Sequence, residues 1–157
     1  MQLQLYSAWS IADLCQESAG HSQLVESGVI HALLTMASCV DGEVKLYSAT
    51  ALALLCETEE IAVLMVSEGL LQALIPLASS EDGLAQVEVA RCFASISRFS
   101  ANTEAIATSG CLQPLLGLMV GSHDASVKIA CAQALGNLAE HREARELITN
   151  LPIDTTQ

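Results

Sequence analysis

GLLQALIPLAS, residues 69–79, is one of three copies of the same phrase. The other copies are GVIHALLTMAS, residues 28–38, and GCLQPLLGLMV, residues 110–120. The glycines that open them, Gly28, Gly69 and Gly110, follow one another at intervals of 41 residues. A period of this length is typical of a protein in which one supersecondary unit is stacked on itself. Function is therefore expected on a repeated surface rather than in a single pocket.

A second phrase lies between the glycines and repeats as well. It reads LQLYSAWSIADLC at residues 3–15, VKLYSATALALLC at 44–56 and VKIACAQALGNLA at 127–139. Another copy, EVARCFASISRFS at 88–100, fits one residue displaced, which predicts a slightly longer connection before it. Small or apolar residues recur at spacings of three and four, as at Leu5, Ala8 and Ile11. This spacing predicts an amphipathic helix in each copy.

A third, shorter apolar cluster precedes each glycine, as at Leu24, Met65 and Ile106. Each cluster predicts one or two helical turns that the glycine ends, because glycine adopts a left-handed conformation at little cost. No window alternates between polar and apolar residues for long, so almost no strand is expected. The predicted unit is a short helix, a glycine, an apolar helix, a polar loop and a long helix.

A three-helix unit of this length and pattern resembles the armadillo repeat. The resemblance covers residues 3–150, and residues 127–139 are its best single match. It implies an all-α fold, a right-handed α-solenoid whose third helices line a concave groove, and a protein-binding role. HEAT repeats are the nearest alternative, but they use two helices and would not need the glycine before each second helix.

The units predict an array over residues 1–150 and a C-terminal tail over residues 151–157. The array divides into a partial repeat 1–19, full repeats at about 20–58, 59–101 and 102–141, and a partial repeat 142–150. Leu151 and Pro152 stand where the next glycine would fall. Stacked repeats need polar end faces, and the phrase that opens the chain has none. We therefore expect either a fragment of a larger armadillo-repeat protein or self-association through exposed terminal repeats.

The chain is strongly acidic, with a formal net charge of −12. Such a surface repels phosphate groups, so neither a nucleic acid nor direct membrane binding is expected. A protein partner that binds through a basic peptide segment is favoured. The alternative is that acidity merely keeps an alanine-rich solenoid soluble. No basic segment precedes an apolar one in the manner of a signal peptide, and we expect a cytoplasmic or nuclear location.

Six cysteines are spread over the array. Cys15 aligns with Cys56, and Cys92 with Cys131, at core-facing positions of the third helices, while Cys39 falls in a loop and Cys111 in a second helix. Without a CxxC motif or a cluster with histidine, they are expected to be buried free thiols in a reducing compartment. No metal and no cofactor is expected.

Known catalytic motifs are missing from the sequence. No GxSxG, P-loop, HExxH or GxGxxG string occurs. The acidic run Glu57, Glu59 and Glu60 is typical of a solvated connection rather than of a buried catalytic pair. The chain is therefore not expected to be an enzyme.

The third helices have a face that the core pattern does not use. Positions separated by three, four and three residues lie along one stripe of a helix. Counted from Asn137, the stripes predict a partner-binding ladder of Tyr6, Trp9, Asp13, Tyr47, Thr50, Leu54, Glu57, Arg91, Arg98, Gln133 and Asn137.

The armadillo resemblance implies a mechanism for this ladder. In peptide-binding members an asparagine on each third helix bonds the backbone of an extended partner, because an amide both donates and accepts. A tryptophan one turn earlier forms a slot for side chains. Asn137 keeps the asparagine, whereas Asp13, Leu54 and Arg98 replace it.

Tyr6, Trp9 and Tyr47 form an aromatic cluster near Asp13 and Glu57 on two neighbouring units. Aromatic rings beside carboxylates can hold a lysine or arginine side chain. Alternatively, the tyrosines simply pack beside the preceding helix. The sequence thus leaves open a binding module, a structural or self-associating spacer, and the regulatory array of a ubiquitin ligase or other enzyme.

Overall fold

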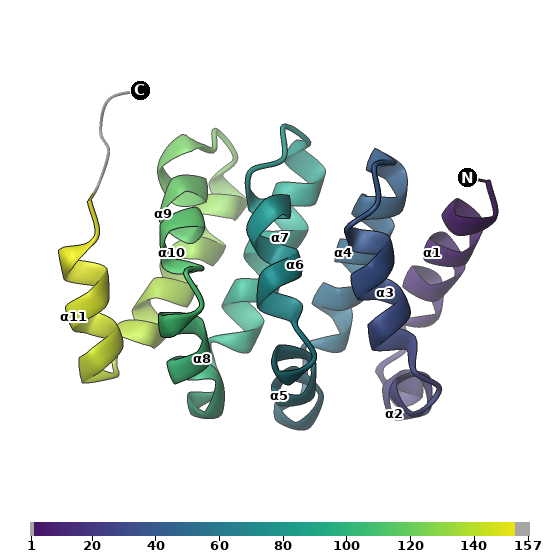
Figure 1. Cartoon of the computed structure of the whole chain (residues 1–157), viewed down its shortest axis with the longest axis horizontal. Helices are drawn as coiled ribbons and strands as arrows, with labels where there is room; N and C mark the ends of the chain where they lie inside the picture. The colour runs from purple at the N-terminus through teal and green to yellow at the C-terminus, as the bar shows by residue number, and fades with distance from the viewer. Residues whose placement is uncertain (1, 153–157) are drawn as a thin grey trace.

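The computed structural model describes residues 2–152 and consists there of helices alone (Figure 1). The all-α prediction is confirmed. The long third helices are α1 (Gln2–Leu14), α4 (Gly42–Leu55), α7 (Gly83–Ile96) and α10 (Ala125–Ala139). The second helices are α3 (Val29–Ala37), α6 (Leu70–Ala78) and α9 (Leu112–Gly121). The first helices are α2 (His21–Glu26), α5 (Glu59–Ser67), α8 (Thr103–Thr108) and α11 (Arg142–Asn150), with 3-10 turns at Ser18–Gly20 and Ser100–Asn102 before α2 and α8.

The repeated glycines turn the chain from each first helix into each second helix. Gly28, Gly69 and Gly110 have φ values of 83°, 103° and 86°, and no other described residue has a positive φ. A side chain on the α-carbon would be strained in this left-handed region. The left-handed glycine expected from the sequence is confirmed at all three positions.

An aspartate caps the N-terminus of each of the third helices α4, α7 and α10. The carboxylates of Asp41, Asp82 and Asp124 accept hydrogen bonds from the backbone N–H groups of Val44, Leu84 and Ser126 at 3.1, 2.9 and 2.7 Å. These bonds satisfy donors that a helix start leaves without intrahelical partners. The caps therefore fix where each third helix starts.

The cap positions correct the alignment of the third helices. Asp41 and Asp82 are 41 residues apart, whereas Asp82 and Asp124 are 42 apart. Because the glycines keep an interval of 41, the additional residue lies between Gly110 and Asp124. The prediction of a longer connection before α7 is wrong, and residues 85–97, not 88–100, correspond to residues 44–56.

The core follows the corrected alignment. Leu52, Phe93 and Leu135 occupy the same position of α4, α7 and α10, and all three are buried. Leu33, Leu74 and Leu115 are equivalent in the second helices and are fully buried. In Figure 1 the units stand side by side, with the second helices in front of the third helices and the first helices below them. One continuous core therefore runs through the array.

Side chains of two first helices complete the ends of the preceding third helices. His21 Nε2 donates to the carbonyl oxygen of Cys15 at 2.8 Å, and Asn102 Nδ2 donates to that of Ile96 at 3.1 Å. Both side chains are buried, so these bonds satisfy carbonyl groups that the helix end leaves open. They tie each unit to the next.

The cysteines are free thiols, and all except Cys39 are buried. The corrected alignment places Cys92 with Ala51 and Ala134, so the predicted equivalence of Cys92 and Cys131 is wrong. Cys111 lies just before α9 rather than inside it. Burial raises the pKa values of Cys15 and Cys131 to about 11.

Within residues 2–152 no single helix is long and apolar enough to cross a membrane. The pair α5 and α6 would pass on length and composition together, but the two helices meet at 81°.

Candidate partner-binding groove

The third helices lie beside one another and present one face to solvent. Helix α1 packs on α4, α4 on α7, and α7 on α10. The corrected alignment gives the rows across this face as Tyr6, Tyr47, Glu88 and Ala130; Trp9, Thr50, Arg91 and Gln133; Asp13, Leu54, Ser95 and Asn137; and Gln16, Glu57, Arg98 and Glu140.

This alignment changes the predicted stripe of α7. The sequence-based stripe ran through Arg91, Ala94 and Arg98, whereas the structural stripe runs through Glu88, Arg91, Ser95 and Arg98. Arg91 thus stands level with Trp9 rather than with Tyr6. Ser95, not Arg98, occupies the asparagine position. The predicted stripe lies three residues too far along the helix, because residues 88–100 rather than 85–97 were matched to residues 44–56.

A hollow of about 280 Å³ opens between α1, α4 and α7. Its lining includes the predicted residues Trp9, Asp13, Tyr47 and Thr50. Trp9 is 51% exposed, while Tyr47 is partly buried against the core. Tyr6 is 63% exposed and does not line this hollow. The aromatic cluster therefore reduces to Trp9 and Tyr47 at the hollow itself.

Glu88 lines the same hollow and was not predicted. Its carboxylate receives a hydrogen bond from Arg91 Nη1 at 3.0 Å, and its side chain is only 15% exposed. Burial raises the pKa of Glu88, and the neighbouring Arg91 guanidinium opposes this shift. The hollow thus combines two aromatic rings with the carboxyl groups of Asp13 and Glu88.

Two further hollows flank Arg98. One, of about 510 Å³, is lined by Glu57, Ala94, Ser95, Arg98 and Gln133. The other, of about 360 Å³, is lined by Glu59, Ser97, Arg98, Phe99, Ser100, Asn137, Glu140 and His141. Glu57 is the acidic residue of the larger of these hollows, and Glu59 and Glu140 are those of the smaller one.

Arg98 is held in place by its neighbours. Its Nη2 donates to the carbonyl oxygen of Glu57 at 3.4 Å, and its guanidinium lies over the Phe99 ring, 5.4 Å from the centroid. A cation over an aromatic face is attracted by the ring. Arg98 therefore bridges two units instead of extending freely into the groove.

Asn137 also bonds to the preceding unit. Its Nδ2 donates to Ser97 Oγ at 3.1 Å. Leu54, at the equivalent position of α4, packs against the core. Leu54 has no amide and that of Asn137 is already bonded to Ser97, so the groove has no regular asparagine ladder.

Most of the predicted partner-binding residues line one of these three hollows. The structure brings Trp9, Asp13, Tyr47 and Thr50 to the first hollow, Glu57, Arg98 and Gln133 to the second, and Arg98 and Asn137 to the third. Tyr6, Leu54 and Arg91 line none of them. Among residues 2–152, no group of three His, Cys, Asp or Glu side chains could hold a metal ion.

Comparisons with known proteins agree with the architecture. The armadillo/beta-catenin-like repeat family matches residues 99–140. An engineered protein of known structure superposes with a TM-score of 0.84 at 28% identity over 94% of this chain. A designed armadillo repeat protein gives a TM-score of 0.85 at 17% identity over 92% of the chain. A second designed one, solved in complex with the peptide (KR)4, gives 0.84 at 19% identity over 92%.

The chain covers 61%, 62% and 62% of those three proteins, respectively. No curated protein sequence matches it at a significant level. The helix order, the left-handed glycines, the match over residues 99–140 and the structural neighbours agree that residues 2–152 form an all-α solenoid with the architecture of armadillo repeats.

Proposed function

We propose that the protein is a non-enzymatic protein-binding module that receives a basic, extended segment of a partner in the groove of its third helices. The observation that carries this proposal is the hollow formed by Trp9, Asp13, Tyr47 and Glu88. These residues come from three consecutive third helices. A segment lying across the units would therefore meet them together.

The chemistry of the hollow suits a lysine or arginine side chain. The aliphatic stem can pack on Trp9 and Tyr47, and the ring faces attract a nearby cation. The carboxylates of Asp13 and Glu88 can accept charge-assisted hydrogen bonds from its head group. The net charge of −12 would attract such a segment from a distance.

The remainder of the groove favours the same partner. Glu57, Glu59 and Glu140 surround Arg98, whose guanidinium is already held by Phe99 and Glu57. A basic segment therefore meets carboxylates along the groove. The designed armadillo protein that binds (KR)4 supports this choice, since its partner consists of lysine and arginine.

Calorimetric titration with the (KR)4 peptide tests the proposal. Trp9→Ala should weaken binding about tenfold, because cation attraction and apolar packing are both lost. Glu88→Gln should weaken it by a smaller factor, and Trp9→Phe should retain part of the affinity. Helical circular dichroism should stay unchanged, since Trp9 is half exposed. Equal affinity of the wild type, Trp9→Ala and Glu88→Gln would contradict the groove assignment.

A structural role is the second candidate, and exposed apolar side chains favour it. Leu3 and Leu14 of α1 and Ile129 of α10 are among the exposed large hydrophobic residues. They lie on helices near opposite ends of the described array (Figure 1). Stacking of copies would bury them. Sedimentation velocity over a range of concentrations tests this version, and a monomer at every concentration would rule it out.

The proposed setting is the cytoplasm or the nucleus. All six cysteines are free thiols, and five of them are buried. Free thiols persist in reducing compartments. Imaging of the tagged protein in cells tests this location.

A further inference from the structure

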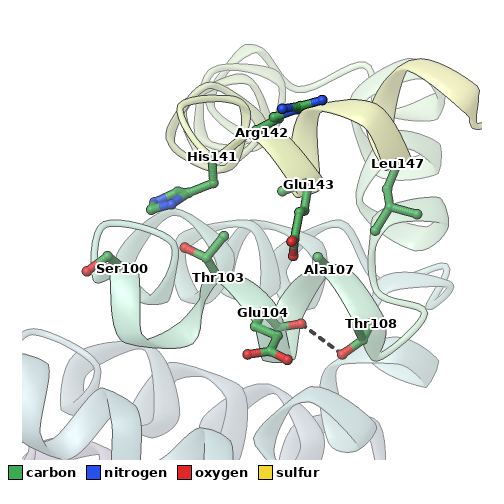
Figure 2. A pocket seen from close by; sticks show the side chains of 10 residues that line it. Ser100, Thr103, Glu104, Ala107, Thr108, His141, Arg142, Glu143 and Leu147 are labelled. Carbon is green, nitrogen blue, oxygen red and sulfur yellow. Dashed lines mark hydrogen bonds between the residues drawn. The ribbon is translucent and has the colours of Figure 1, made fainter.

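A cleft separates the first helices α8 and α11, away from the groove of the third helices (Figure 2). Its volume is about 300 Å³. Ala107, Ala144 and Leu147 supply apolar lining, and Thr103, Glu104 and Glu143 supply polar groups. The cleft is thus a small, partly apolar site that carries two carboxyl groups, and His141 and Arg142 line it as well.

Thr103 is the unusual residue of this cleft. It is only 7% exposed, and its hydroxyl is buried without a hydrogen-bond partner among the described residues. Leaving such a group unpaired costs free energy. Figure 2 shows Thr103 on the side of α8 that faces α11. A bound group that reaches its hydroxyl would remove this penalty.

Neither acidic side chain of the cleft forms an ion pair with a basic side chain of residues 2–152. Glu143 extends from α11 toward α8, with Glu104 on α8 beneath it (Figure 2). Arg142 Nε binds Glu146 at 3.1 Å, and its guanidinium points away from α8. Arg145 Nε donates to the carbonyl oxygen of Ala139 at 2.7 Å. Arg142 therefore lines the cleft while its guanidinium pairs with Glu146, and Arg145 is bonded to the backbone.

We propose that this cleft binds a lysine side chain of a partner protein. An ammonium group has three donors and no acceptor, which matches the oxygens of Thr103, Glu104 and Glu143. The four-carbon stem of lysine matches the apolar lining of Ala107, Ala144 and Leu147. The cleft shares no lining residue with the Trp9 hollow, and it shares only Ser100 and His141 with the hollow at Asn137.

The test is a heteronuclear NMR titration of the whole chain with Nα-acetyl-lysine amide. Binding should move the backbone amide signals of α8 and α11 in a saturable manner at millimolar concentration. The same compound acetylated on Nε has lost the charge and should move them little. Equal shifts with both compounds, or none with either, would overturn the proposal.

Variants identify the groups that bind. Glu143→Gln should weaken binding about threefold, as expected for a partly exposed ion pair. Glu68→Gln, which removes the same charge outside the cleft, is the matched control and should leave the affinity unchanged. Equal losses in both variants would show a general charge effect and contradict the site.

Thr103→Val gives a second, independent readout. The substitution removes the unpaired hydroxyl at nearly constant shape, so the free protein should be at least as stable as the wild type. Lysine-amide binding should nevertheless weaken. Unchanged binding would remove Thr103 from the site.

Trp9→Ala separates this site from the proposed groove. Lysine amide can also bind at the Trp9 hollow, but its effects there appear in α1, α4 and α7. The shifts of α8 and α11 should persist in Trp9→Ala. If they disappear with the groove signals, the cleft is not a separate binding site.

Discussion

Single residues set the geometry of each unit, and the repeated glycines do so most directly. Gly69 has a φ of 103°, and a β-carbon built there would meet no atom within 4 Å. The constraint is therefore conformational strain rather than crowding. An alanine at this position would have to adopt a left-handed conformation that alanine rarely visits.

Gly69→Ala should lower the free energy of unfolding by about 1–2 kcal/mol, the usual cost of left-handed backbone. The measurement is urea unfolding followed by circular dichroism. Gly136→Ala is the matched control, because Gly136 lies exposed inside α10 with open space around it. It should raise stability by up to about 1 kcal/mol, since alanine favours helix over glycine. Equal effects of the two substitutions would contradict the strain argument.

The thiols offer another prediction at the residue scale. Cys39 is the only one of the six that is not buried. A disulfide reagent at neutral pH should label Cys39 rapidly in the native protein, because the other thiols are shielded and burial raises the pKa values of Cys15 and Cys131 to about 11. Mass spectrometry counts the labels. Cys39→Ser should abolish the rapid phase, and rapid labelling of several sites would show that the core opens readily.

At the scale of the helix, the sequence predicted type and order well. Periodicity identified the long third helices, and Gly28, Gly69 and Gly110 marked where the second helices begin. These signals are local, so they are readable from the sequence. The prediction that was wrong is the alignment of α7 with the other third helices. Small and apolar residues are so frequent in α7 that residues 88–100 match the phrase nearly as well as residues 85–97.

The same error explains what was missed in the candidate site. Glu88 was left out because α7 was aligned three residues too far along. Asp41, Asp82 and Asp124 carried the missing signal, since a capping residue fixes the helix start independently of the apolar pattern. That Asn137 would bond Ser97, and Arg98 the carbonyl oxygen of Glu57, depends on packing between units. Periodicity within one helix does not contain this information.

The cap of α7 can be tested directly. Asp82→Ala should lower stability by about 1 kcal/mol, because the bond to the Leu84 N–H is lost. Asp82→Asn should retain most of the stability, since asparagine caps a helix equally well. Thermal unfolding in parallel for both variants provides the measurement. A loss of the same size in Asp82→Asn would mean that charge, not the hydrogen bond, carries the effect.

At the scale of the molecule, acidity is distributed unevenly along the array. No lysine or arginine precedes Lys45, whereas Arg142 and Arg145 both lie in α11. The Trp9 hollow therefore stands at the more acidic end of the groove. A basic partner should be oriented by this gradient as well as attracted by the total charge.

Binding of the (KR)4 peptide should depend on pH through Glu88. Burial raises its pKa above the ordinary value of about 4.3 for glutamate. As the solution is acidified, the affinity for (KR)4 should therefore begin to fall at a higher pH than it would if Glu88 had the pKa of an ordinary glutamate. Titrations at several pH values, at constant salt, measure this. In Glu88→Gln the corresponding part of the pH dependence should vanish.

Folding should respond to Glu88 in the opposite direction. Because its folded-state pKa is raised, Glu88 favours the folded state when protonated, and this contribution is lost as the pH rises through its pKa. Unfolding measured against pH, compared with Glu88→Gln, separates the two effects. If affinity falls or stays constant as Glu88 ionises, the carboxylate is not acting as the peptide-binding group.

The extra residue between Gly110 and Asp124 has a practical meaning for engineering. It is taken up before the loop, since α9 runs to Gly121 and residues 122–124 join it to α10, against residues 79–82 between α6 and α7. Val127, Ala134 and Leu138 of α10 nevertheless remain buried in line with their counterparts in α7. Because Asp124 caps α10, this helix starts at a fixed residue, and its buried face keeps the orientation of the corresponding face of α7. These outer loops should therefore tolerate grafted peptides or epitope tags. The array can acquire new sequence at its rim without turning its binding face.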